Sequence, residues 1–172
     1  MRILSILAVL FCFQSFASAA LPTVERVEVP EYVGKWYAVW ALPQSFTKNC
    51  VAQTADYKVI DSSSISVLNT CIKENGSTKT IKGRAVVTNK RTNAELEVTF
   101  DNFWTKLFRV KGDYNILKLD PSYSTVLVGS NNLKSLWILS RTPYISTEVE
   151  REYIDYAKSL GFDVSKLQES KF

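Results

Sequence analysis

The residue types that most often carry chemistry limit what this chain can do. Its 172 residues include no histidine, which excludes Ser-His-Asp or Cys-His hydrolysis, a His-Glu-x-x-His metal site and a histidine-ligated haem. The carboxylates of Glu95, Glu97 and Asp101 fall on strand surfaces or loops, where solvation explains them. We therefore expect no enzyme activity, no metal and no cofactor. Catalysis by tyrosines remains as an alternative.

The first nineteen residues have the layout of a secretory signal peptide. Arg2 supplies a positive start, residues 3–13 are almost wholly apolar, and Ala17-Ser18-Ala19 offers a small-residue cleavage site. The apolar run is well short of the ~20 residues that cross a bilayer, which disfavours a membrane anchor. We expect cleavage of residues 1–19, one domain over 20–172, and export to the periplasm or outside the cell. Cys12 lies inside the apolar run, so we expect no lipoprotein anchor.

Removal of this leader leaves Cys50 and Cys71 as an even pair in an oxidising compartment. Thiols in such compartments tend to pair, so we expect a disulfide between them. Two free buried cysteines are the alternative.

The charged residues are scattered along the chain. The formal net charge of +4 is not gathered into a basic block, so we expect no nucleic-acid partner. Peripheral contact with an anionic membrane surface stays open.

Short β-rich segments follow one another from Trp36 onward at intervals of about ten residues, which is typical of an antiparallel barrel or sandwich. Asn75-Gly76 is a strong hairpin signal, because both residues tolerate positive φ. The segments span residues 34–41, 51–60, 65–73, 80–88, 94–100, 114–119, 125–129 and 136–140. Eight strands suffice to close a barrel around one small ligand, although a filled sandwich has the same count.

The pattern changes to a helical period after residue 145. Ser146 can cap a helix, Val149, Tyr153 and Ala157 recur on one face, and Gly161 can end it. We expect one amphipathic helix packed on the outside of the strands.

Three motifs in order resemble the signature regions of the lipocalin family. They are Gly-Lys-Trp-Tyr at 34–37, Gly-Asp-Tyr at 112–114, and Leu-Trp-Ile-Leu-Ser-Arg-Thr-Pro at 136–143. The resemblance covers the mature chain and is closest to the branch of apolipoprotein D and the bacterial outer-membrane lipocalin. It implies an all-β fold, an eight-stranded antiparallel up-and-down barrel with one C-terminal α-helix packed outside.

The resemblance also assigns an inner surface. Gly34, Trp36 and Arg141 would close the barrel floor, with Arg141 stacked over Trp36. An Arg141 that grips a ligand carboxylate is the alternative. With Trp36 facing inward, alternation predicts an apolar ligand-binding lining. It comprises Ala38, Trp40, Ala55, Tyr57, Val67, Ala85, Val87, Leu96, Val98, Phe100, Tyr114, Ile116, Val126, Val128, Trp137 and Leu139.

Aromatic and basic residues gather in the loops expected at the open end. Exposed aromatics such as Phe46 and Phe103 are unusual unless something covers them, so we expect these two to contact the ligand; a lid, a membrane-touching rim and a dimer contact are all open explanations. Lys106 and Arg109 stand nearby and can contact an anionic head group.

These features predict a carrier of one small hydrophobic molecule, a fatty acid or a lysophospholipid, that acts as a monomer or weak homodimer. The alternatives are a pigment or tetrapyrrole binder, motivated by Trp40, Trp137 and Tyr114, and an interaction scaffold whose filled barrel displays loops.

Overall fold

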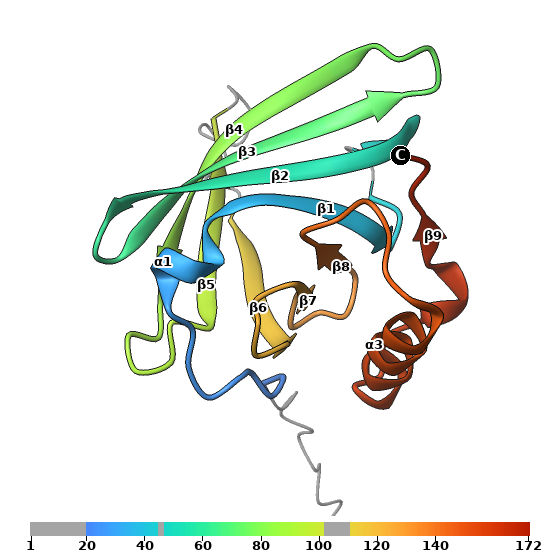
Figure 1. Cartoon of the computed structure of the whole chain (residues 1–172). Helices are drawn as coiled ribbons and strands as arrows, with labels where there is room; N and C mark the ends of the chain where they lie inside the picture. The colour runs from blue at the N-terminus through green and yellow to red at the C-terminus, as the bar shows by residue number, and fades with distance from the viewer. Residues whose placement is uncertain (1–19, 45–46, 102–110) are drawn as a thin grey trace, which may run out of the picture.

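A computed structural model describes residues 20–44, 47–101 and 111–172 (Figure 1). Within these residues eight strands form a barrel and a short ninth strand joins it. The strands are β1 (Gly34–Ala41), β2 (Cys50–Asp61), β3 (Ser64–Lys73), β4 (Thr78–Val87), β5 (Glu95–Phe100), β6 (Gly112–Leu119), β7 (Thr125–Gly129), β8 (Leu136–Ser140) and β9 (Gln168–Glu169).

Antiparallel pairing runs through the strands in the order β2-β3-β4-β5-β6-β7-β8-β1, and β1 also pairs with β2, which closes the barrel. The predicted eight-stranded antiparallel barrel is confirmed. Its closed end carries the turns after β2, β4 and β6 together with the short helix α1 (Val29–Tyr32). Its open end carries the connections after β1, β3, β5 and β7.

The turns follow the residues that the sequence marks. Asp61 Oδ1 accepts hydrogen bonds from the Ser63 amide and the Ser64 hydroxyl, which fixes the turn between β2 and β3. Gly76 has a φ of 76° in the turn between β3 and β4, as the Asn-Gly signal predicts.

The C-terminal helix α3 (Thr147–Ser159) lies outside the barrel beside β7 and β8 (Figure 1). The Ser146 hydroxyl accepts a hydrogen bond from the Val149 amide and caps the helix. Tyr153 and Ala157 are buried against Leu127 and Ile138 on the outer face of the strands. The predicted position of the helix is confirmed. No helix among the described residues is long and apolar enough to cross a membrane.

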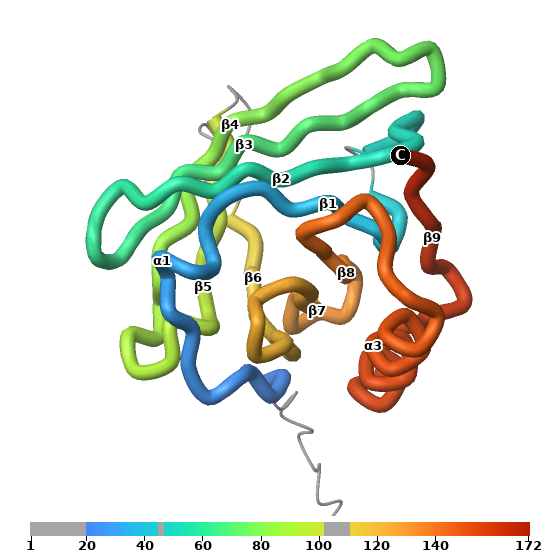
Figure 2. The backbone as a smooth tube through the Cα atoms, viewed as in Figure 1, coloured from blue at the N-terminus to red at the C-terminus, as the bar shows by residue number. Residues whose placement is uncertain are grey.

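Strand β9 fills a gap in the barrel wall that the sequence did not predict. β1 pairs with β2 only over residues 34–37 against 54–57, and the two strands then separate toward the open end. The C-terminal segment lies in this gap, where the Ser170 amide donates to Val39 O and the Lys171 amide donates to Val51 O. Figure 2 shows the C terminus beside the start of β2.

Candidate functional site

The barrel interior gathers apolar side chains from all eight barrel strands. One buried cluster contains most of the predicted lining, and Phe100, Tyr114 and Trp137 pack against it. Its predicted members are Ala38, Ala55, Tyr57, Val67, Ala85, Val87, Leu96, Val98, Ile116, Val126, Val128 and Leu139. A second cluster, between the strands and α3, holds the apolar residues of the outer face.

The prediction that Trp40 faces inward is wrong. Ala38 pairs with Leu139, but Trp40 pairs with Ile138, so the strand carries one extra residue at Val39. Such a β-bulge reverses the alternation beyond it. Trp40 therefore packs against the outer cluster, on the same side as Ile138.

Gly83 does not leave open space in the lining. A Cβ atom at this position would lie 2.7 Å from the Thr99 carbonyl oxygen and 2.9 Å from the Phe100 ring. The ring of Phe100 covers the glycine from the neighbouring strand.

Arg141 closes the floor of the barrel. Its guanidinium lies 3.7 Å from the centre of the Trp36 ring. Nη2 donates to the carbonyl oxygens of Glu31, Tyr32 and Val33, while Nη1 donates to Lys35 O and Nε to Tyr123 O. All three guanidinium nitrogens thus donate to backbone carbonyls. This favours a structural role for Arg141 in closing the barrel over binding of a ligand carboxylate.

Gly34 makes room for this arrangement. Its φ is 104°, which side chains rarely permit, and a Cβ atom there would lie 3.2 Å from Arg141 Nη1. The indole of Trp36 is fully buried and donates to Tyr32 O over 2.9 Å.

Three tyrosine hydroxyls meet inside the barrel above the floor. The Tyr114 oxygen lies 2.6 Å from the Tyr32 oxygen and 3.1 Å from the Tyr57 oxygen. Tyr57 and Tyr114 belong to the predicted lining, but Tyr32 comes from α1. Sequence reasoning missed Tyr32, because it lies outside the predicted strands and only the fold brings it inward.

Burial keeps this cluster uncharged. It raises the pKa of Tyr57 to about 12 and raises the pKa values of Tyr32 and Tyr114 well above their ordinary range. The three hydroxyls carry three hydrogens, but the cluster contains only two hydrogen bonds. One hydrogen therefore has no acceptor within the cluster, whichever oxygen donates in each bond.

Asn69 supplies a second buried polar group on the inner face. It pairs with Ala55 and Ile81 and lies two residues beyond Val67 on β3, toward the open end. Its Oδ1 is buried and has no hydrogen-bond partner among the residues that the structure describes. Such a group is costly to bury unless a ligand or water satisfies it.

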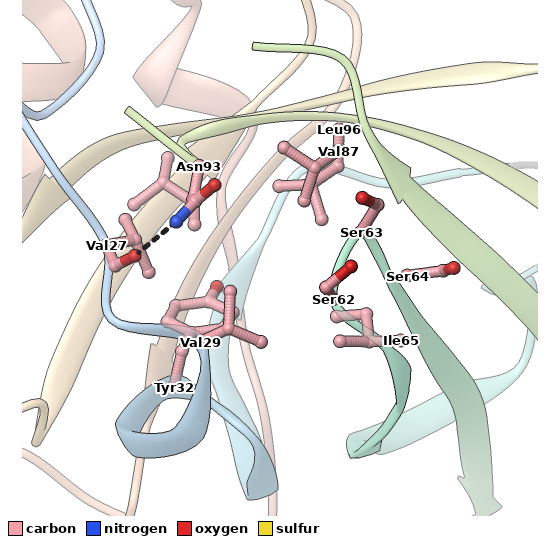
Figure 3. A pocket seen from close by; sticks show the side chains of 11 residues that line it. Val27, Val29, Tyr32, Ser62, Ser63, Ser64, Ile65, Val87, Asn93 and Leu96 are labelled. Atoms are coloured by element: carbon pink, nitrogen blue, oxygen red, sulfur yellow. Dashed lines mark hydrogen bonds between the residues drawn. The ribbon is translucent and has the colours of Figure 1, made fainter. Parts of the chain in front are cut away.

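Two hollows lie elsewhere on the described part of the chain. One, at the closed end between α1 and the turn after β2, is lined by Val29, Tyr32 and Ser62 among others (Figure 3). Its volume of about 10 Å³ holds no more than one water. The other, of about 210 Å³, lies at the gap in the barrel wall, where β1, β2 and β9 meet, and is lined by Leu42, Gln53 and Lys171 among others.

The disulfide joins Cys50 to Cys71, with a Cα–Cα distance of 5.3 Å. It links β2 to β3 near the open end, which confirms the predicted pairing. Four predicted residues of the open end lie outside the described residues, namely Phe46, Phe103, Lys106 and Arg109.

Known proteins match this chain over most of its length. A family described as a lipocalin-like domain matches residues 27–171. The outer membrane lipoprotein Blc of Vibrio cholerae is 35% identical over 84% of this chain and 82% of its own. Mouse apolipoprotein D is 31% identical over 85% of this chain and 77% of its own.

The fold has solved counterparts as well. The structure of insecticyanin from the tobacco hornworm superposes with a TM-score of 0.68 at 17% identity, covering 90% of this chain and 85% of that one. That similarity concerns the fold alone. With the closed barrel, the floor built on Trp36 and Arg141 and the matches in sequence, the chain belongs to the lipocalin family.

Proposed function

We propose that this protein binds one small hydrophobic molecule inside its barrel and carries or stores it, without catalysis. The observation that carries the proposal is the single apolar lining to which all eight barrel strands contribute. Ala38, Ala55 and Ala85 keep this lining from filling the centre with large side chains, and the floor is shut. A ligand would therefore enter from the open end.

The proposed ligand is a single-chain lipid, a fatty acid or a lysophospholipid. A flexible acyl tail suits a lining of aliphatic and aromatic side chains. The names of the relatives, a lipoprotein of the outer membrane and an apolipoprotein, support a lipid-related role. Phe46 and Phe103 would contact the ligand at the open end, and Lys106 and Arg109 would meet an anionic head.

A second candidate rests on the buried polar groups. The spare phenolic hydrogen of the tyrosine cluster and Asn69 Oδ1 together offer one donor and one acceptor inside the barrel. A ligand hydroxyl would satisfy either group, and a carbonyl would satisfy the donor. These groups favour a hydrophobic ligand with an oxygen at its buried end. The pigment alternative is less well supported, because Trp40, one of the three aromatic side chains expected to stack on a pigment, lies outside the barrel.

The same proposal places the mature protein outside the cytoplasm, after removal of residues 1–19, as a monomer or weak homodimer. The disulfide supports export, since such bonds persist in oxidising compartments. The bacterial relatives are named lipoproteins, so they lend no support to the expectation that this chain lacks a lipid anchor.

Tryptophan fluorescence tests the proposal, because two tryptophans lie on opposite sides of the barrel wall. Trp137 packs against the inner cluster and Trp40 against the outer one. Titration with oleate or a lysophospholipid should change the emission saturably at one ligand per protein. Trp137→Phe should reduce the change, with any remainder from Trp36 of the same inner cluster, and the matched control Trp40→Phe should leave it in place.

The scaffold alternative makes the opposite prediction. A filled barrel that only displays its loops would give no saturable change with any of these lipids. A change that Trp40→Phe abolishes and Trp137→Phe preserves would place the ligand on the outer surface and overturn the proposal.

A further inference from the structure

We infer that Lys79 and Lys73, on the hairpin of β3 and β4, select ligands with an anionic oxygen head group. The inference rests on the proposed function and adds the residues that would hold the ligand's charged end. Both lysines lie among the described residues, and their proposed role does not depend on Lys106 or Arg109.

The strand register places both lysines on the inner face. Lys79 pairs with Cys71, and the pairing of β3 with β4 continues without a bulge down to Ile65 and Ala85, which are buried in the barrel interior. Side chains alternate along a strand, so Lys79 shares the face of Ala85. Lys73 shares it as well, because it lies two residues beyond Cys71 on β3.

The β3–β4 hairpin extends farther toward the open end than its pairing with β5 does. β4 pairs with β5 only over residues 83–87, whereas its pairing with β3 continues to Thr78. Figures 1 and 2 show this hairpin projecting from the open end. Its inner face therefore overlooks the path by which a ligand enters.

The ammonium groups of Lys73 and Lys79 give this inner face a positive charge. Both lysines are exposed, and neither takes part in any ion pair found among the described residues. The acidic side chain nearest in sequence, Glu74, lies in the turn. Residues 73 and 79 are diagonal neighbours across the strand pair, at a spacing of roughly 7–8 Å, so one head group can lie between them.

The length of the barrel agrees with this position. Val87 lies near the floor, and the eight residue steps from Lys79 to Val87 span about 26 Å at the usual strand rise. An extended long-chain fatty acid has a similar length. A tail that reaches the lower lining thus leaves its carboxylate or phosphate at the level of the two lysines.

Charge reversal with a matched control tests the inference. We compare Lys79→Glu and Lys73→Glu with Lys82→Glu, since Lys82 is exposed on the same strand but pairs with Leu68 on the outer face. The ligands are oleate, oleoyl lysophosphatidic acid and the uncharged monoolein, which separate carboxylate, phosphate and neutral head groups. Binding is followed by tryptophan fluorescence at two salt concentrations.

We expect each inner-face variant to weaken both anionic ligands by about three- to tenfold, less at high salt, because exposed charge pairs are modest and screened. Monoolein binding should stay unchanged, and Lys82→Glu should behave as the unaltered protein. Equal effects of all three variants, or an equal loss of monoolein binding, would overturn the inference.

A parallel measurement separates the ligand from a membrane. Sedimentation with phosphatidylglycerol vesicles should be altered no more by Lys79→Glu than by Lys82→Glu. Loss of vesicle binding with unchanged affinity for the free lipids would overturn the inference in favour of a membrane contact. Failure of the unaltered protein to bind any of the three lipids would overturn the proposed function itself.

Discussion

Replacement of Arg141 by methionine should open the barrel floor. Methionine keeps an apolar stem beside Trp36 but removes the charge over the ring and every hydrogen bond to the carbonyls of Glu31, Tyr32, Val33, Lys35 and Tyr123. The helix α1 and the β6–β7 turn would then lose the side chain that joins them to the barrel.

The magnitude follows from these contacts. A hydrogen bond to a charged group contributes about 1.5–3 kcal/mol and a sheltered cation–π contact about 1–2 kcal/mol. The carbonyls lie near the surface and regain water, and such contributions do not add, so we expect a loss of about 3–4 kcal/mol in the free energy of unfolding. For a chain of this size that lowers the Tm by about 10 °C.

The assay compares the urea unfolding of Arg141→Met with that of the control variant Arg84→Met. Arg84 forms an exposed ion pair with Asp61, and such pairs contribute little to stability. Arg141→Lys should recover only the cation–π part, because an ammonium group cannot reach five separate carbonyls. An Arg141→Met protein that unfolds at the same urea concentration as Arg84→Met would refute the floor role.

Three further predictions concern the disulfide, the tyrosines and the C terminus. Replacing Cys50 and Cys71 together by serine should lower stability by about 3 kcal/mol, since the bridge spans 21 residues of sequence; unchanged urea unfolding would contradict this. Because Tyr57 has a pKa raised to about 12, the unfolded chain releases this proton first, so Tyr57 alone should lower stability between about pH 10 and 12 by about 1.4 kcal/mol per pH unit, and Tyr32 and Tyr114 should add to the fall. Tyr57→Phe should make the fall less steep by the share of Tyr57 in alkaline urea titrations, and an equally steep fall would argue against the buried hydroxyl. Deletion of residues 168–172 removes the backbone bonds to Val39 and Val51 and should speed dissociation of a bound lipid in stopped-flow measurements, whereas an unchanged rate would show that the gap between β1 and β2 is not a route to the interior.

Much of this fold could be predicted from the sequence because alternation and turn residues act locally. The eight strands and the helix follow from those patterns, and the lining follows wherever a strand keeps its period. The predicted inward orientation of Trp40 is wrong because the extra residue at Val39 depends on the pairing of β1 with β8, which no local sequence pattern indicates.

Other features depend on segments that meet only in the folded chain. Tyr32 reaches Tyr114 across 82 residues of sequence, and β9 is placed by the separation of β1 from β2. The ring of Phe100 that covers Gly83 comes from the neighbouring strand, and the spacing of residues along β4 does not show it. Packing between distant segments therefore decides how much of the interior is free for a ligand.

Native mass spectrometry of the protein purified from its own source tests the central claim most directly, because it weighs a bound molecule without assuming its identity. We predict one bound molecule per chain, with the mass of a single-chain lipid or a similar hydrophobic compound, that is lost on unfolding. A chain that carries no bound molecule, and that gains none after exposure to oleate or a lysophospholipid, would contradict it.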